Sequence, residues 1–314
     1  MRPVLALVLA VLVPCAAAAA CGEPAPHEGR LVIAAGGGSG VYRAYAEGIA
    51  RAARADGMEA RVLATASAAD NLREVARGRA DVAFAPADVA ALALEGRPPF
   101  QGRLRVSALA RLYDEYTHLV VPADSGVHAL PHLKGRTVAT GAPGTDTETV
   151  ATRLLAAAGI GGGVRTRPLA VRDAAAALRE RRVDALFFSG GVPNEAITQL
   201  THAMGVRLVD LGAYVGPLRR FHGDFYQERS IPAAAYRLFA APRTVGVPSH
   251  LVAGSAMPPG RARALTRLLF ERKDVLVAAR PEALYLNRRG AISTGPLPLH
   301  PGAARYYRDS KVAG

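Results

Sequence analysis

Short apolar runs alternate with stretches of helical spacing along most of the chain. Residues 31–35 form one such run, which suits a strand buried on both faces. After a break of small residues at 36–40, apolar positions return at helical spacing from Val41 to Ala53. Because strand-like and helix-like segments keep alternating in this way, the pattern predicts an α/β fold with parallel strands.

The same pattern predicts the remaining elements. Strands are expected at residues 61–65, 81–85, 104–112, 117–121, 137–140, 164–170, 183–188, 206–211 and 244–252. Helices are expected at residues 70–77, 86–94, 148–158, 172–181, 193–203, 259–271 and 275–286. We expect the polar residues 113–116 to form a corner between two strands, and Pro193 to occupy the first position of its helix.

Loops of small residues follow three of the predicted strands. Residues 36–40 are rich in glycine, which lets the backbone turn sharply and exposes N–H groups at the start of the next helix to an anion. Residues 141–147 form a second loop of this kind with two threonine hydroxyls, and residues 189–194 form a third. Because ligands of open α/β sheets bind beside the carboxyl ends of strands, we expect a binding cleft where these loops meet.

Other interpretations of these loops stay open. The first loop does not fit a Rossmann motif, because Val41 stands where the third glycine belongs, nor a P-loop, because no lysine follows. It can instead be a glycine turn without a ligand. One of the threonines Thr145 and Thr147 can serve as a helix cap, and for Asn71 capping and ligand contact are equally open.

The first 20 residues form a separate segment. Arg2 precedes an apolar stretch at 4–13 and small residues at 16–20, which predicts a signal peptide and export. Cys21 follows directly and is predicted to carry a lipid, with cleavage without lipidation as the alternative. Residues 21–29 then form a tether. The only other cysteine, Cys15, lies in the signal segment, so the mature chain has no disulfide.

Composition and charge exclude several classes of protein. A chain of 314 residues is long enough for two domains. Its net charge of +13 comes from scattered arginines, which we interpret as solvated helix faces with some attraction for anions, so no nucleic-acid partner is expected. The histidines are scattered, no paired metal ligands occur and no nucleophile elbow surrounds Ser39. We expect no metal, no cofactor and no enzymatic activity.

Seven motifs resemble those of TAXI-type solute receptors, the extracytoplasmic binding subunits of tripartite ATP-independent (TRAP) transporters. In order they are GGGSGVY at 36–42, DNL at 70–72, GRADVAFAPADVA at 78–90, LKGRTVATGAPGTDTET at 133–149, VDALFFSGGVP at 183–193, IPAAAY at 231–236 and LPLHPGAARYYR at 297–308. The resemblance runs from Leu31 to about Arg308. It implies an α/β, two-lobed type II periplasmic-binding-protein-like fold with a hinge and an interlobe cleft.

We expect lobe 1 at residues 29–119 and 246–314, and lobe 2 at 120–245. The chain should cross between them near 117–121 and 244–252. The expected ligand-binding residues are Gly38, Ser39, Gly40, Tyr42, Asn71, Thr145, Asp146, Thr147, Gly191, Val192 and Pro193. Tyr45 is expected in the core.

The resemblance also implies what the protein binds. Characterised relatives bind small carboxylates, so a small organic anion is expected, either a dicarboxylate or an amino acid such as glutamate. The chain departs from the family at Pro86 and Ala87, which precede Asp88 in place of a polar pair, and at Asp146 in the second loop. An acidic side chain at a pocket mouth could favour a ligand with an amino group.

The predicted function is capture of this solute outside the cytoplasm and its delivery to a TRAP membrane subunit. We expect a monomer that is attached to the outer face of the cell membrane only through a lipid on Cys21, with a soluble periplasmic protein as the alternative. An exported binding protein of the same fold that serves a sensor without transport is the alternative function.

Overall fold

The computed structural model describes residues 29–36 and 41–312. The predicted signal peptide, Cys21 and the loop residues Gly38, Ser39 and Gly40 lie outside the described residues.

The strands of the described ranges form one mixed sheet. They are β1 (Arg30–Gly36), β2 (Glu59–Thr65), β3 (Val82–Pro86), β4 (Val106–Pro122), β5 (Thr137–Ala139), β6 (Arg165–Arg167), β7 (Ala185–Gly190), β8 (Val206–Leu208), β9 (Gln227–Ser230) and β10 (Arg243–Gly254). The sheet runs β2-β1-β3-β10-β4-β7-β5-β6, with β8 paired to β4 and β9 to β10. Pairing is parallel in β2-β1-β3 and in β7-β5-β6, and antiparallel wherever β4 or β10 takes part.

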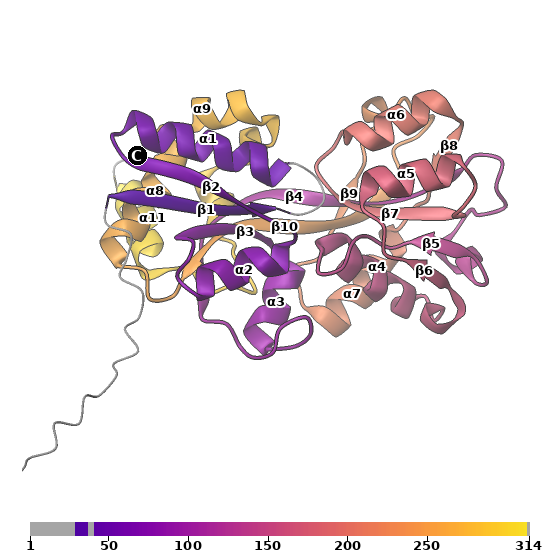
Figure 1. The fold of residues 1–314 in the computed structure, drawn as a ribbon, viewed down its shortest axis with the longest axis horizontal. Helices are drawn as coiled ribbons and strands as arrows, with labels where there is room; N and C mark the ends of the chain where they lie inside the picture. The colour runs from indigo at the N-terminus through magenta and orange to yellow at the C-terminus, as the bar shows by residue number, and fades with distance from the viewer. Residues whose placement is uncertain (1–28, 37–40, 313–314) are drawn as a thin grey trace, which may run out of the picture.

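Helices cover both faces of this sheet (Figure 1). The α-helices are α1 (Val41–Ala55), α2 (Ala68–Ala76), α3 (Ala87–Glu95), α4 (Asp146–Ala157), α5 (Val171–Arg179), α6 (Glu195–Ala203), α7 (Val215–His222), α8 (Pro259–Glu271), α9 (Lys273–Ala279), α10 (Arg288–Ala291) and α11 (Pro301–Val312). Short 3-10 helices are η1 (Leu130–Leu133), η2 (Gly161–Gly163), η3 (Gly212–Tyr214), η4 (Ala233–Ala235) and η5 (Pro281–Tyr285).

Two lobes lie side by side and share the long strands β4 and β10 (Figure 1). One lobe holds β1 to β3 with α1 to α3 and the C-terminal helices, and the other holds β5 to β8 with α4 to α7. Strand β4 pairs with β10 along residues 106–116 and then with β7 along residues 116–120, so a single strand serves both lobes. The predicted two-lobed α/β fold is confirmed.

Each lobe has its own apolar core on the faces of the sheet. In the first lobe Tyr45 and Ile49 of α1 pack with Phe84 of β3, and Tyr45 is fully buried, as expected. In the second lobe Leu154 of α4 packs with Phe187 of β7. Fully burying a side chain of this size stabilises the fold by about 1.5–3 kcal/mol.

The predicted corner at residues 113–116 is wrong, because β4 runs without a break from Val106 to Pro122. Its polar side chain Asp114 has one partner on the same strand and one on β9. Asp114 forms ion pairs with Arg111 (2.5 Å) and Arg229 (2.6 Å). The β4–β10 pairing also shifts register at Ser249, which lets the ladder continue past these residues.

Two predicted helix boundaries are also wrong. Helix α6 begins at Glu195 rather than at Pro193, because the Asn194 side chain caps it. Asn194 Oδ1 accepts hydrogen bonds from the N–H groups of Ala196 and Ile197, at 3.0 and 3.2 Å. The predicted helix at 275–286 is divided: α9 ends at Ala279 and η5 starts at Pro281, since proline has no N–H to continue the helix.

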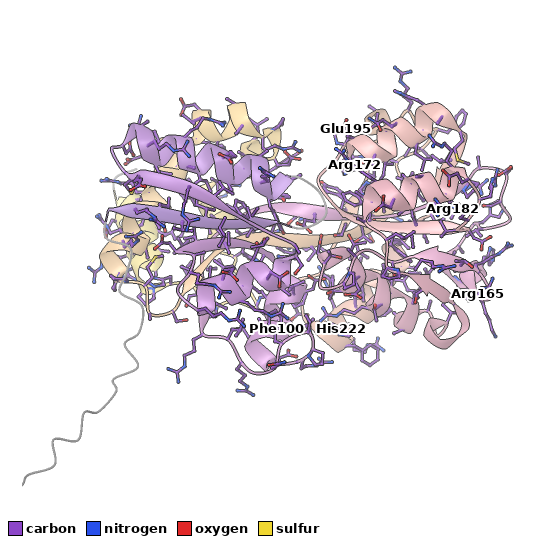
Figure 2. The ribbon with its side chains drawn as sticks, in the orientation of Figure 1. Phe100, Arg165, Arg172, Arg182, Glu195 and His222 are labelled. Carbon is purple, nitrogen blue, oxygen red and sulfur yellow. The ribbon has the colours of Figure 1, made fainter. Side chains whose placement is uncertain are left out.

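The excess positive charge lies on solvated faces, as interpreted from the sequence. Arg165, Arg172 and Arg182 are exposed and project from separate parts of the second lobe (Figure 2). Arg172 pairs with Glu195 at 3.5 Å and Arg182 with Glu180 at 2.7 Å. Exposed pairs of this kind contribute about 0–1 kcal/mol each.

Candidate functional site

Loops from the two lobes meet at the carboxyl ends of the strands. A Cβ added at Gly144, in the second lobe, would lie 3.2 Å from Ser67 Oγ of the first lobe. A Cβ added at Gly191 would lie 2.4 Å from Glu282 Oε1 and 3.0 Å from Val41 Cγ2. The second and third small-residue loops therefore contact the first lobe directly, and the lobes are closed on one another.

A cavity of about 150 Å³ opens between the lobes beside the second loop. It is lined by Ala66, Gly141, Ala142, Thr145, Thr147, Ala170, Val171, Phe187 and Phe188. Two residues predicted to bind ligand, Thr145 and Thr147, thus share one cavity with Ala66 of the first lobe.

Both threonines also hold the second loop in place. Thr145 is the N-cap of α4: its hydroxyl donates to the Ala142 carbonyl at 2.6 Å and accepts from the Glu148 N–H at 3.3 Å. Thr147 Oγ1 accepts from the Ser189 N–H at 3.0 Å, which ties α4 to the end of β7. In the described residues the Thr147 hydroxyl hydrogen has no acceptor, so Thr147 keeps a donor for a ligand in the cavity.

Asp146 lies between the two threonines in sequence, but it is not among the residues that line this cavity. It is 5% exposed, and its carboxylate accepts hydrogen bonds from its own N–H and from that of Thr147. The N-terminal amides of α4, a preferred place for an anion, thus face an anionic side chain of the protein itself. The carboxyl group of Glu115 lies within hydrogen-bond reach.

Glu115, on β4, is more deeply buried than Asp146, with 1% of it exposed. The Ser189 hydroxyl donates to Glu115 Oε2 at 3.5 Å, and Tyr42 also hydrogen bonds to the carboxyl group. No lysine or arginine of the described residues forms an ion pair with Glu115 or Asp146. Burial raises the pKa of Glu115 well above its usual range, and the charge of Asp146 raises it further. We call Glu115 and Asp146 the carboxyl pair.

Tyr42 joins the core to the carboxyl pair. Its ring stacks on Phe84 at 5.1 Å between centroids, and only 3% of the residue is exposed, so it is buried nearly as deeply as Tyr45. Its hydroxyl accepts from Ser249 Oγ of β10 at 3.1 Å. The ring is therefore part of the core, and the hydroxyl lies at the junction between the lobes, beside the carboxyl pair.

The side-chain amide of Asn71 forms hydrogen bonds with residues of three strands. Its side-chain N–H₂ donates to the carbonyls of Gly36 (3.3 Å) and Phe84 (2.9 Å), and its oxygen accepts from Thr65 Oγ1 at 2.5 Å. Ser67 is the N-cap of α2, so Asn71 does not cap this helix. Its predicted role in ligand contact stays a prediction.

The third loop is held by a chain of hydrogen bonds from the shared strand β4. The Asn194 N–H donates to the Tyr236 hydroxyl at 2.7 Å, which lies 3.1 Å from His118 Nε2. His118 Nδ1 lies 2.8 Å from the Tyr116 carbonyl. Burial lowers the pKa of His118 to about 4, so the ring is neutral at pH 7 and can accept from the tyrosine. Gly191, Val192 and Pro193 lie just before Asn194.

Asp88, fully buried on α3, lies across the lobe junction from Arg153 of α4. Its Oδ1 accepts from the Val89 N–H at 2.8 Å, while Oδ2 has no hydrogen-bond partner in the described residues. Arg153 donates to the Tyr226 hydroxyl at 2.6 Å. Burial raises the pKa of Asp88 to about 6, although the charge of Arg153 opposes the shift.

This pKa predicts that the ligand-free protein loses stability as the pH rises. The unfolded carboxyl group releases its proton near pH 3.8 and the folded one near pH 6, so the folded state binds more protons between these values. Stability should fall through this window by on the order of 3 kcal/mol and change little above it. We expect Asp88→Asn to remove this part of the fall. Urea unfolding of both proteins from pH 4 to pH 8 checks it; parallel curves would contradict it.

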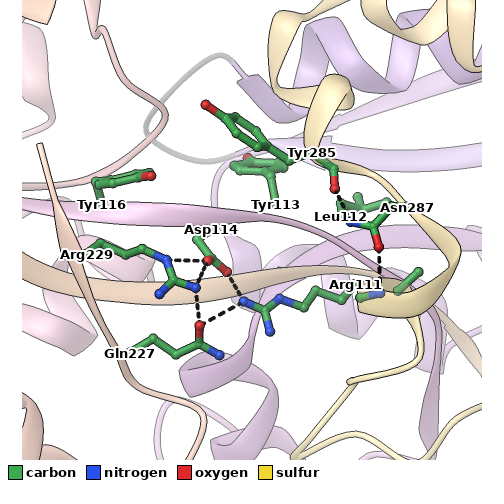
Figure 3. A pocket seen from close by; sticks show the side chains of 11 residues that line it. Arg111, Leu112, Tyr113, Asp114, Tyr116, Gln227, Arg229, Tyr285 and Asn287 are labelled. Carbon is green, nitrogen blue, oxygen red and sulfur yellow. Dashed lines mark hydrogen bonds and ion pairs between the residues drawn. The ribbon is translucent and has the colours of Figure 1, made fainter. Parts of the chain in front are cut away.

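A second cavity, of about 380 Å³, lies along residues 111–116 of β4 (Figure 3). Its wall carries Arg111, Asp114 and Arg229, with Gln227 accepting from both arginines. Tyr113, Tyr116 and Tyr285 also line it, as do Leu112, Asn287, Gly290 and Ala291. None of the ligand-binding residues predicted from the sequence lines this cavity.

The sequence did not lead us to predict that Glu115, Tyr113 and Ser249 lie at the junction between the lobes. The available signal was the polar group at residues 113–116 between two apolar strand segments, which we interpreted as a corner. A polar group inside a strand that is otherwise buried can instead mark a place where side chains face a site.

Comparisons with known proteins place the chain in a broad group. Residues 33–310 match the model of the NMT1-like family. The fold is similar to that of the periplasmic aliphatic sulphonate binding protein SsuA from Escherichia coli (TM-score 0.53, 14% identity, 89% of this chain and 82% of that chain). It is also similar to an ancestral arginine-binding protein bound to arginine (0.52, 15%, 81% and 97%) and to lactococcal OpuAC complexed with glycine betaine (0.52, 13%, 90% and 96%). At this identity the likeness to solved structures shows the fold alone. No helix within the described ranges is long and apolar enough to cross a membrane.

Proposed function

The chain belongs to the NMT1-like family, and on this premise we propose that it is an extracytoplasmic solute-binding protein that closes its two lobes on a small organic solute. The observation that carries the proposal is the meeting of loops from both lobes beside one cavity, at the carboxyl ends of the strands. A solute that touches both lobes stabilises the closed arrangement, because only there are all its contacts made.

The motifs of the sequence support a more specific proposal. The solute is a small organic anion, a dicarboxylate or an amino acid such as glutamate, and the protein delivers it to a TRAP membrane subunit as a TAXI-type receptor. We propose that the lobes divide at residues 119/120 and 245/246, within the two strands β4 and β10 that they share. Export and a lipid on Cys21 complete the proposal. A sensor without transport is the alternative, and it would share the same site.

The proposed ligand-binding residues are those predicted from the sequence, and the described ones differ in how much of their hydrogen-bonding capacity they have left. Thr147 keeps a hydroxyl hydrogen beside the cavity, whereas Thr145 donates to one carbonyl and caps α4. Gly191, Val192 and Pro193 supply backbone next to the first lobe.

Replacing Thr145 and Thr147 by alanine tests the second loop. We expect Thr147→Ala to weaken solute binding about tenfold, because a hydrogen bond to a charged group contributes about 1.5–3 kcal/mol. Thr145→Ala should instead lower the unfolding free energy by about 1 kcal/mol, since it removes a helix cap. Calorimetric titration and thermal unfolding of each single variant and of the double variant separate the two effects.

Small-angle scattering with and without solute tests closure in the same proteins. We expect the radius of gyration of the wild type to be smaller with bound solute. An unchanged radius, together with undiminished affinity in the double variant, would rule out a clamp built from the second loop.

A further inference from the structure

We propose that the solute carries a cationic nitrogen, as an ammonium or guanidinium group, and that the carboxyl pair Glu115 and Asp146 binds it. The inference rests on the proposed function and narrows the solute class from small carboxylates in general to those with an amine.

The first argument is charge. Three carboxyl groups gather in the junction, and all are nearly inaccessible to water: Glu115 is 1% exposed, Asp146 5% and Asp88 0%. Only Asp88 faces a basic side chain, that of Arg153, within this group. An ionised group removed from water is costly unless an opposite charge accompanies it. A positive charge would therefore stabilise the ionised form of the carboxyl pair, and the described residues do not supply one.

The second argument is the use of the α4 N-terminus. In many binding sites such a terminus holds an anionic ligand. Here the Asp146 carboxylate accepts from the amides of Asp146 and Thr147. The negative charge at this position is built into the protein, so a solute carboxylate placed beside it would meet repulsion, and a cation would meet attraction.

The third argument is the presence of unpartnered groups around the pair. The Tyr113 hydroxyl is 3% exposed and has no hydrogen-bond partner in the described residues, although it lies in the field of both Glu115 and Asp146. Oδ2 of Asp88 is likewise unpartnered. Buried polar groups normally have partners, and both of these oxygens can accept from a donor that a ligand brings. An ammonium group has three N–H donors and no acceptor, which matches this set of oxygens.

The charge of the pair fits a single cationic group. One cationic nitrogen balances one carboxylate, and the second carboxyl group retains its proton and hydrogen bonds to the first.

Matched pairs of small acids test the inference directly. Glutamate and 2-oxoglutarate differ in having an ammonium or a keto group at the same carbon, and aspartate and oxaloacetate form a second pair. Putrescine adds a diamine without a carboxylate. We expect the wild type to bind at least one of the three amines about 100-fold more tightly than it binds any of the keto acids, as measured by calorimetry and thermal shift.

Variants then assign the contact. Because the pair holds one proton, the double variant Glu115→Gln/Asp146→Asn is used to remove its charge while keeping size and hydrogen bonding, and it should weaken binding of that amine tenfold or more. The double variant Glu115→Asp/Asp146→Glu keeps the charge and should retain more affinity. Removing a buried charge should leave the melting temperature of the ligand-free protein unchanged or raised, so lost binding will not reflect unfolding. Glu180→Gln, on the exposed surface of the second lobe, is the matched control and should bind as the wild type does.

The outcomes separate the inference from the proposed function. A keto acid that binds as tightly as its amino partner, or an undiminished affinity in the Glu115→Gln/Asp146→Asn double variant, overturns the inference and leaves solute binding intact. If none of the five compounds stabilises the wild type, and a wider set of amines and acids also fails to do so, both the inference and the proposed function are contradicted.

Discussion

Replacing Asn71 by alanine is expected to lower the free energy of unfolding by about 1–3 kcal/mol. The side chain is fully buried, and its amide satisfies the carbonyls of Gly36 and Phe84 and the Thr65 hydroxyl. Alanine leaves the Phe84 carbonyl buried without a partner, whereas Gly36 and Thr65 are only partly buried and water can replace part of what they lose. Each such unsatisfied group costs about 1–3 kcal/mol.

Asn287→Ala is the matched control. Asn287 is exposed and accepts from the Gly290 N–H at 2.8 Å as the cap of the short helix α10. Losing a cap should cost about 1 kcal/mol. Urea unfolding of the ligand-free proteins measures both changes. Unaltered stability of Asn71→Ala, combined with lost solute affinity, would mean that ligand contact is the main role of Asn71.

Replacing Gly191 by valine is expected to weaken solute binding by about tenfold to a hundredfold. The added side chain would start 2.4 Å from Glu282 Oε1 and 3.0 Å from Val41 Cγ2 when the lobes are closed. Glu282 cannot move aside freely, because Arg280 holds both of its oxygens, at 2.6 and 3.0 Å. Overpacking of this kind costs about 1–3 kcal/mol, which falls on the closed state that the solute requires.

The lobes can separate to relieve this clash, so Gly191→Val should unfold at nearly the wild-type temperature when no solute is present. Gly162→Val, in the same lobe but with nothing near the added atom, should bind as the wild type does. Titration calorimetry gives the affinities, and scattering with saturating solute should show a larger radius of gyration for Gly191→Val. Equal affinities and radii would show that the third loop does not limit closure.

Local chemistry allowed much of the fold to be predicted. The apolar run at 31–35 lies in β1, and helix periodicity from Val41 gives α1 with Tyr45 in the core. Where a prediction was wrong, a partner distant in sequence decided the outcome. Residues 113–116 stay in β4 because they pair with residues 246–249 of β10, more than 100 positions later, and Arg229 also pairs with Asp114 at 2.6 Å.

In the candidate site, too, local features could be predicted and contacts between distant residues could not. Spacing alone indicated that the loop around Thr145 opens a helix at a strand end, and the structure shows Thr145 and Thr147 at one cavity. Spacing could not indicate that Asn71 binds the ends of three strands, because its partners Gly36 and Phe84 are 35 and 13 positions away.

The sequence by itself determined the order of strands and helices and the glycine loops, since these depend on periodicity and on backbone freedom within a few residues. The two-lobed arrangement was implied by the resemblance of its motifs to those of a known family. Only the tertiary structure decided which side chains lie together at the junction between the lobes. Glu115 and Asp146 are 31 positions apart, and Tyr42 comes from another helix. Their charge becomes significant only when closure of the lobes removes them together from water, because the energy of a carboxylate depends on burial and neighbours rather than on its place in the chain.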